Sequence, residues 1–511
     1  MSSFFKGIAL FVAITCAVWI AVLWRWEATS RDMNTPDIVV YLGLLPLTVF
    51  GLALLLRWAW RGAAARQTAA AAAAAVAASA NAGPAVPAAM SNDESRRHST
   101  VQLLAAHLLC AAGATPSELL AAAKEGKPRP ALDPELRDDD GLPVFTARLP
   151  DLDLESVEPL LGSRLDAVRA QRAEWSAAEL PEHRLRALAA LQPVLLEAAR
   201  SLLPWHKRFE VEPPAGLSER PDRTERTERK VRVLLGWPAD WSEFDQEVGR
   251  AFATGVLATI STDELPAQTF VLTTLAGSGE ALILQADRLL QTLARDGRDD
   301  PVLVAACHSA IGADAVAALD RQGQLFSSAR SPRGRMPAEA AAALVLAAAD
   351  WPAAPGGDGA PPSHLHRPAL VVRDKPVDAP GRIDPATAVL AMEQALATSQ
   401  QVAGGIGGLV SDADQHTARS AELHGGALAV LPHLDASEDL RLLGTVTGAV
   451  DAVGALLVLA CAAAQAQAAD APCLALACGD PLARLSLVAL PGPPKAAAAP
   501  GPSPGTPGPI A

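Results

Sequence analysis

Two uninterrupted apolar stretches dominate the hydropathy pattern at the start of the chain. They cover residues 8–24 and 38–56, which are about 17 and 19 residues long. At 1.5 Å per residue, a helix of either length can cross the apolar layer of a bilayer, which is about 30 Å thick. We therefore predict two transmembrane helices, at about 8–24 and 38–58, that form a hairpin within residues 1–61.

The charges that flank these stretches predict their orientation. Lys6 precedes the first stretch, and Arg57, Arg61 and Arg66 follow the second, whereas the connection between them balances its charges. Basic flanks favour the cytoplasmic side of a membrane. The sequence thus predicts a multi-pass protein of the bacterial inner membrane, with its soluble part in the cytoplasm. A cleavable signal peptide is the alternative for the first stretch, but no small-x-small cleavage site follows it.

The rest of the chain divides by composition and periodicity. Residues 62–98 are rich in Ala and read as a linker, and the Pro/Gly/Ala-rich residues 492–511 are expected to be a disordered tail. Between them, short apolar runs alternate with helical stretches rich in Ala and Leu, which predicts an α/β fold with buried, largely parallel strands. The expected strands are 231–235, 269–273, 302–306, 342–346, 369–372, 426–431 and 485–490.

Composition narrows the classes of partner and chemistry. The formal net charge is -13, and no concentrated basic face is present, so we expect no nucleic-acid partner. The cysteines are too few for a disulfide scaffold and their spacing matches no zinc site, so we expect buried, reduced thiols and no metal or other cofactor. They are Cys16, Cys110, Cys307, Cys461, Cys473 and Cys478.

Six segments follow one another in an order typical of one enzyme family. Residues 103–127 read as strand, turn and helix, and 271–279 (Val-Leu-Thr-Thr-Leu-Ala-Gly-Ser-Gly) run from a strand into a predicted helix at 280–293. The others are 302–312, 334–346 (Gly-Arg-Met-Pro-Ala-Glu-Ala-Ala-Ala-Ala-Leu-Val-Leu), 410–422 and 444–453 (Gly-Thr-Val-Thr-Gly-Ala-Val-Asp-Ala-Val). Together they resemble the β-ketoacyl-ACP synthases of the thiolase superfamily.

This resemblance implies a fold and a division of the chain. It implies a thiolase-like domain over residues 99–491, in which a duplicated unit forms α-β-α-β-α layers. The N-terminal half would cover about 99–355 and the C-terminal half about 365–491.

The resemblance also implies where the catalytic residues of a condensing enzyme would stand. Family members use a cysteine at a helix N-terminus, two histidines and a lysine. Those positions hold Ala276, Asp412, Thr445 and Leu440 here, in the order cysteine, first histidine, second histidine and lysine. A methyl group cannot attack a thioester, and an ionised Asp412 would repel an enolate. We therefore expect a pseudoenzyme without catalytic residues.

The leading functional hypothesis is a non-enzymatic, membrane-anchored scaffold or docking subunit with an unidentified protein partner. Members of the family are typically dimers through a strand beside the nucleophile helix, so the resemblance implies a homodimer. Two alternatives remain open. One is residual acyl-carrier, acyl-thioester or lipid binding or turnover, and the other is an accessory role in an envelope or type VI secretion assembly.

Several polar residues outside this pattern have structural interpretations. Residues 307–309 (Cys-His-Ser) lie on a predicted strand, where neighbours point to opposite faces, so a catalytic Cys–His pair is not expected. His364 and His366 could offer two metal ligands, but the surrounding prolines predict a surface loop. His416 and His424 are expected to be surface side chains.

Overall fold

The computed structural model describes residues 98–209, 229–260, 265–354, 361–379 and 381–492. The predicted transmembrane hairpin, linker residues 62–97 and tail residues 493–511 lie outside these ranges. By its internal contacts the chain separates into Met1–Ala88 and Ala89–Ala511, and all described residues belong to the second unit.

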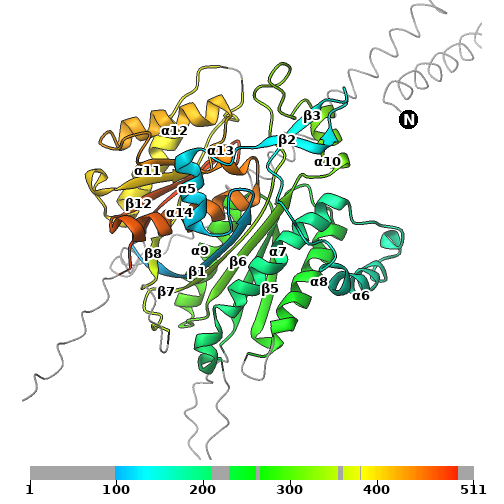
Figure 1. Cartoon of the computed structure of the whole chain (residues 1–511). Helices are drawn as coiled ribbons and strands as arrows, with labels where there is room; N and C mark the ends of the chain where they lie inside the picture. Colours follow the sequence, from blue (N-terminus) through cyan, green and yellow to red (C-terminus); the bar gives the residue numbers. More distant parts are fainter. Residues whose placement is uncertain (1–97, 210–228, 261–264, 355–360, 380, 493–511) are drawn as a thin grey trace, which may run out of the picture. The chain divides into compact units, whose positions relative to one another are not determined.

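One 11-stranded mixed sheet organises the described residues (Figure 1). Across the sheet the strands follow the order β11 (Leu440–Leu442), β10 (Gly408–Ser411), β12 (Cys473–Ala477), β13 (Ala483–Leu490), β8 (Ser363–His366), β1 (Thr100–Cys110), β7 (Glu339–Ala348), β6 (Val302–Ser309), β4 (Val231–Trp237) and β5 (Phe270–Ala276). A further strand, β9 (Ala369–Val372), pairs with β13.

The two halves of the sheet repeat one pairing pattern. In the N-terminal half, β4 is parallel to β5 and β6, and β7 is antiparallel to β6 and β1. In the C-terminal half, β10 is parallel to β11 and β12, and β13 is antiparallel to β12, β8 and β9. If β8 and β9, which both pair with β13, are counted as one strand, each half places its strands in the order third, second, fourth, fifth, first. The halves join where β1 pairs with β8.

The α/β class predicted from the sequence is confirmed, but the expectation of largely parallel strands is wrong. The connection from β12 to β13 is a short turn, and a short turn returns the chain antiparallel. Helices cover both faces of the sheet, so antiparallel strands such as β7 are buried on both sides. A strand buried on both faces is apolar throughout, and its sequence cannot reveal its direction.

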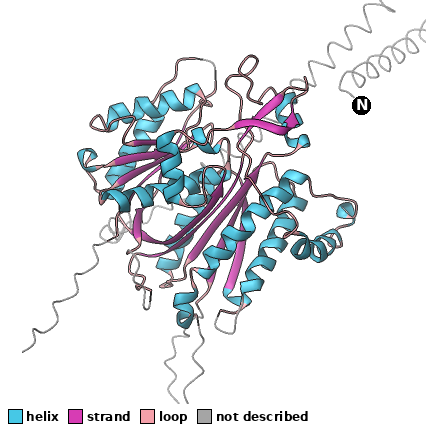
Figure 2. Ribbon diagram, viewed as in Figure 1, coloured by secondary structure: helices cyan, strands magenta, loops and turns pink. Residues whose placement is uncertain are grey.

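Helices pack on both faces of each half-sheet (Figures 1 and 2). α7 (Glu182–Arg200) and α8 (Glu243–Ile260) share one core with the N-terminal half, and α11 (Ala386–Ser399) and α12 (Thr417–Val430) share another with the C-terminal half. α9 (Gly279–Arg295) and α14 (Ala452–Ala469) belong to a third core, which takes side chains from strands of both halves. Two helices thus form a central layer between two half-sheets.

The apolar composition of α14 fits its position at the centre of the protein. Among the described residues it alone is long and apolar enough to cross a membrane, with a mean hydropathy of 1.7, and 72% of it is buried in the protein. Strands of both halves pack around it, so it has no polar face.

The described residues also form smaller elements outside the 11-stranded sheet. A two-stranded sheet forms from β2 (Ala131–Arg137) and β3 (Pro143–Thr146). The remaining helices are α5 (Pro116–Glu125), α6 (Glu158–Arg169), α10 (Ala313–Arg321) and α13 (Gly444–Thr447).

One predicted strand, 426–431, is wrong, whereas the other six overlap observed strands. Residues 426–430 belong to α12, where Gly426 lies against Met392 of α11 so closely that an added Cβ would come within 2.6 Å of the Met392 methyl carbon. A short apolar run fits a buried helix face as well as a strand, and here tertiary packing selects the helix.

Candidate functional site

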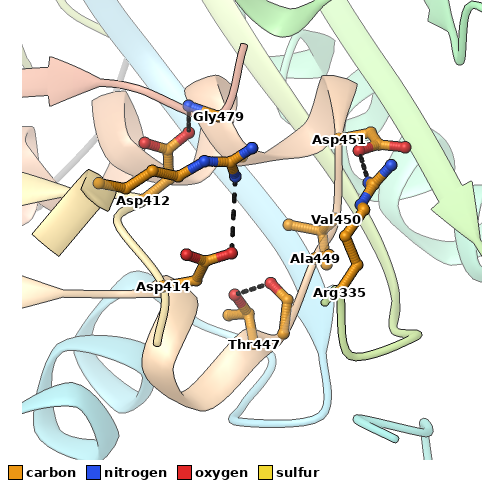
Figure 3. A pocket seen from close by; sticks show the side chains of 11 residues that line it. Arg335, Asp412, Asp414, Thr447, Ala449, Val450, Asp451 and Gly479 are labelled. Atoms are coloured by element: carbon orange, nitrogen blue, oxygen red, sulfur yellow. Dashed lines mark hydrogen bonds and ion pairs between the residues drawn. The ribbon is translucent and has the colours of Figure 1, made fainter. Parts of the chain in front are cut away.

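A small polar pocket lies between the loop after β10, the loop before β7 and the N-terminus of α14 (Figure 3). Its cavity volume is about 20 Å³, which is room for one water molecule. Its walls combine backbone with charged side chains. The lining residues are Arg335, Asp412, Asp414, Arg419, Thr447, Gly448, Ala449, Val450, Asp451, Gly454 and Gly479.

Three consecutive backbone N–H groups between β12 and β13, at Cys478, Gly479 and Asp480, all donate to carboxyl groups. Asp412 accepts from Cys478 at 2.7 Å. It also accepts from Gly479 at 3.1 Å (Figure 3). The N–H of Asp480 donates to Oε1 of Glu280 at 3.1 Å. We call residues 478–480 the amide turn. Successive N–H groups of this kind form an anion-binding concavity, and here the protein's own side chains occupy it.

Glu280 reaches the amide turn from the first turn of α9. Ser278 caps this helix by accepting from the N–H of Ala281, and Glu280 itself is only 3% exposed. Burial and the nearby negative charge of Asp412 raise the pKa of Glu280 to about 7. Sequence reasoning missed this residue. The available signal was a single carboxyl group in the apolar stretch that begins α9.

The two arginines of the pocket are neutralised by aspartates. Arg335 forms an ion pair with Asp451 (Figure 3). Arg419 lies 3.5 Å from a carboxylate oxygen of Asp414 and 3.8 Å from one of Asp378. The cations of the pocket are therefore already paired within the chain.

Asp451 holds a backbone conformation that favours glycine. Its φ and ψ are 40° and -118°, and it precedes the first residue of α14. One oxygen of Asp451 lies 3.5 Å from Nδ1 of His308, and burial, followed by the charge of Arg335, lowers the pKa of His308 to about 3. His308 is thus neutral, and Asp451 relies on Arg335 for its charge partner.

The four positions implied by the resemblance lie in different surroundings, and only Asp412 lines the pocket. Ala276 is the exposed last residue of β5. Leu440 is 7% exposed and pairs with Leu409 at the start of β11. Thr445 donates its hydroxyl to the carbonyl of Leu442 at 2.7 Å. None of these three presents a free polar group to the pocket.

The structure contradicts some of the predictions made for the histidines and confirms one of them. His364 and His366 lie on strand β8 and not in a surface loop, because the chain pairs there with β1. His416 is buried, accepts from the N–H of Ala418 at the start of α12 and lies 3.2 Å from Asp378, so the surface prediction was wrong for it. His424 is exposed, as predicted.

Cysteine chemistry is absent from the pocket. The five described cysteines are buried and free, as predicted, while Cys16 lies outside the described residues. Cys307 packs in the core under α7 and α8, whereas His308, the next residue on β6, lies beside Asp451. Among the described residues, no group of three or more His, Cys, Asp or Glu could hold a metal ion.

No family model and no curated protein sequence matches the chain. Solved structures with a similar fold include the ishigamide ketosynthase/chain length factor, at 18% identity and a TM-score of 0.47 over 77% of this chain and 100% of that one. The ketosynthase ApeO with its chain length factor ApeC from Xenorhabdus doucetiae is 14% identical, with a TM-score of 0.48 over 77% of this chain and 98% of that one. A β-ketoacyl synthase from Burkholderia phymatum is 12% identical, with a TM-score of 0.47 over 77% of this chain and 99% of that one. This likeness concerns the general fold, a large mixed sheet covered by helices.

Proposed function

We propose that the chain is a non-catalytic, β-ketoacyl-synthase-like protein that acts as a membrane-anchored docking subunit. The observation that carries this proposal is the closed state of the amide turn, whose three N–H groups are all taken by Asp412 and Glu280. In acyl transfer, such N–H groups would have to be free to stabilise an oxyanion. Membrane anchoring rests on the hydropathy of residues 8–24 and 38–56.

Nucleophile and space are also missing from the pocket. Its lining contains no cysteine, serine or histidine side chain, and its one hydroxyl, on Thr447, donates to backbone carbonyl oxygens. A cavity of about 20 Å³ admits a water but not an acyl chain. These features favour a binding role over residual acyl-thioester turnover.

The open edge of β5 is the surface that we assign to docking, and a second copy of the chain is its occupant. β4 is the only described strand that pairs with β5, so the other side of β5 offers unpaired backbone groups. The strand, Phe-Val-Leu-Thr-Thr-Leu-Ala, has no charge or proline, the features that usually protect an edge strand from pairing. Two copies of β5 can pair antiparallel about a two-fold axis and satisfy both edges.

The catalytic part of the proposal is tested with full-length protein and acyl- and malonyl-thioesters. We expect neither a covalent acyl adduct by mass spectrometry nor release of carbon dioxide or free thiol above the buffer rate. Turnover that disappears in Asp412→Asn or Glu280→Gln would overturn the proposal, because it would assign chemistry to the groups described here as a closure.

The docking part is tested by measuring the mass of the full-length protein in detergent. Val271→Lys combined with Thr273→Lys places like charges across the two-fold axis, and we expect it to convert a dimer to a monomer without lowering the thermal midpoint. Leu428→Lys is the matched control, because it changes another exposed apolar residue, 74% exposed on α12, and should leave the dimer intact. A monomeric parent, or a dimer that survives the double substitution, would contradict docking at β5.

A further inference from the structure

We propose that Glu280 and Asp412 form a proton-linked latch, in which a single proton, held by one of the two carboxyl groups, keeps the amide turn closed against α9. The latch is independent of the docking proposal. It joins the N-terminal half, through α9, to the turn between β12 and β13 of the C-terminal half.

The geometry brings both carboxyl groups to the same side of one glycine. A Cβ added to Gly479 would lie 2.9 Å from Oδ2 of Asp412 and 4.0 Å from Oε1 of Glu280. Both groups bind neighbouring N–H groups of the same turn. Negative charges on both groups would repel each other in this buried site, so one carboxyl group holds a proton.

The hydrogen bonds indicate which group keeps its charge. Asp412 accepts from two backbone N–H groups, which favours its ionised form, whereas Glu280 accepts from one. Burial raises the pKa of both groups, and Asp412 adds to the shift of Glu280. Glu280 is therefore the group that carries the proton, below about pH 7.

The surrounding charges do not cancel this repulsion. Asp480, on the turn itself, adds negative charge beside Glu280, and Cys478 stays a neutral thiol because burial raises its pKa. Arg484 of β13 is the cation that faces both carboxyl groups, but it is held by Glu422 of α12 at 2.7 Å. Arg419, which also faces Asp412, is paired with Asp414, and Asp451, which precedes α14, is paired with Arg335.

Loss of the proton from Glu280 should loosen the turn. A protonated Glu280 accepts from Asp480 without adding charge, but an ionised Glu280 places a second anion on a turn whose other two N–H groups already bind Asp412. As the pH rises towards about 7, the turn would therefore separate more often from α9, and the pocket beside it would open.

Hydrogen exchange of full-length protein in detergent tests the latch. After correction for intrinsic exchange rates, we expect the amides of residues 478–480 to lose protection as the pH rises from the ordinary Glu pKa of 4.5 to the raised pKa of Glu280, about 7, and to change little above it. Glu280→Gln should retain protection throughout, and Asp412→Asn should reduce the loss. Glu125→Gln, which changes an exposed carboxyl group on α5, should behave as the parent.

A second measurement needs no variant that folds. In the parent chain, the infrared carbonyl band of a protonated carboxyl group should disappear as the pH rises through about 7. Absence of such a band at pH 6, or protection of residues 478–480 that does not change with pH in the parent, would overturn the latch. So would an equal loss of protection in the parent and in Glu280→Gln.

Discussion

The guanidinium of Arg186 holds both carboxylate oxygens of Glu339, at 2.6 and 2.9 Å, in a position that solvent does not reach. Arg186 lies on α7, and Glu339 begins β7. The hydroxyl of Ser309 and the N–H of Leu149 also donate to this carboxylate, at 3.1 and 2.7 Å. Glu339 thus ties a helix, the end of β6 and the segment after β3 to the start of one central strand.

Removing the charge of Glu339 is expected to destabilise the fold severely. Glu339→Gln leaves Arg186 as an unpaired buried cation, and such a break costs about 3–5 kcal/mol. The free energy of unfolding, measured with urea on full-length protein, should fall by that amount. Glu197→Gln is the control, because its pair with Arg200 is about half exposed on each side and should cost less than about 1 kcal/mol.

A double substitution separates the charge effect from packing. Arg186→Met combined with Glu339→Gln removes both charges, so we expect it to recover part of the stability lost in Glu339→Gln alone. A double variant less stable than the single one would mean that Arg186 contributes mainly by its packing.

Backbone strain at Asp451 predicts opposite effects for two small replacements. Asp451→Ala keeps the φ of 40° and loses the ion pair with Arg335, so it should be clearly less stable than the parent. Asp451→Gly loses the same ion pair but relieves a strain of about 1–3 kcal/mol. Thermal melts should therefore rank glycine above alanine at this position, and equal midpoints would contradict a strained backbone.

Most strands of the sheet could be predicted from the sequence, whereas most of the pocket could not. Strands such as β6, eight buried residues in succession, are visible as apolar runs because their local composition determines their burial. The pocket depends on contacts between distant segments. Glu280 meets Asp480 across 200 positions of the chain, and Asp412 meets Cys478 across 66. Contacts between residues so far apart in the sequence cannot be predicted from a local pattern of residues.

The surroundings of His416 could not be predicted from the sequence for the same reason. The sequence predicts His416 at the surface, yet it accepts from the first turn of α12 and lies beside Asp378. Asp412 was singled out as a substituted position, but its role as acceptor for the amide turn became visible only with the fold.

Burial predicts that the native cysteines do not react in the folded chain. It raises the pKa of Cys110 to about 11 and that of Cys473 to about 12, and Cys307, Cys461 and Cys478 are equally enclosed. Thiolate is the reactive form, so these five groups should resist a maleimide until the protein unfolds.

An added cysteine provides the positive control for that measurement. In a Cys16→Ser background, Ala276→Cys should react with one equivalent of maleimide per chain, because Ala276 is exposed at the end of β5. Labelling of more than one thiol under native conditions would contradict the burial of the native cysteines. The same variant should form no acyl adduct with a thioester substrate, since no histidine lines the pocket.

The contact between the central helices α9 and α14 predicts the cost of a single methyl group. A Cβ added at Gly279 would lie 2.5 Å from the carbonyl oxygen of Ala452 and 2.8 Å from Cβ of Ala455. Both neighbours are fixed parts of α14, so neither can rotate away, and overpacking of this kind costs about 1–3 kcal/mol. Gly279→Ala should therefore lower the urea midpoint, whereas Gly404→Ala, which meets nothing within 4 Å, should leave it nearly unchanged. Because Gly279 adjoins Glu280, displacement of α9 should also weaken the bond to Asp480, and exchange of that amide should increase with the loss of stability. A stable Gly279→Ala variant with an unchanged amide would show that the two central helices can separate without consequence for the pocket.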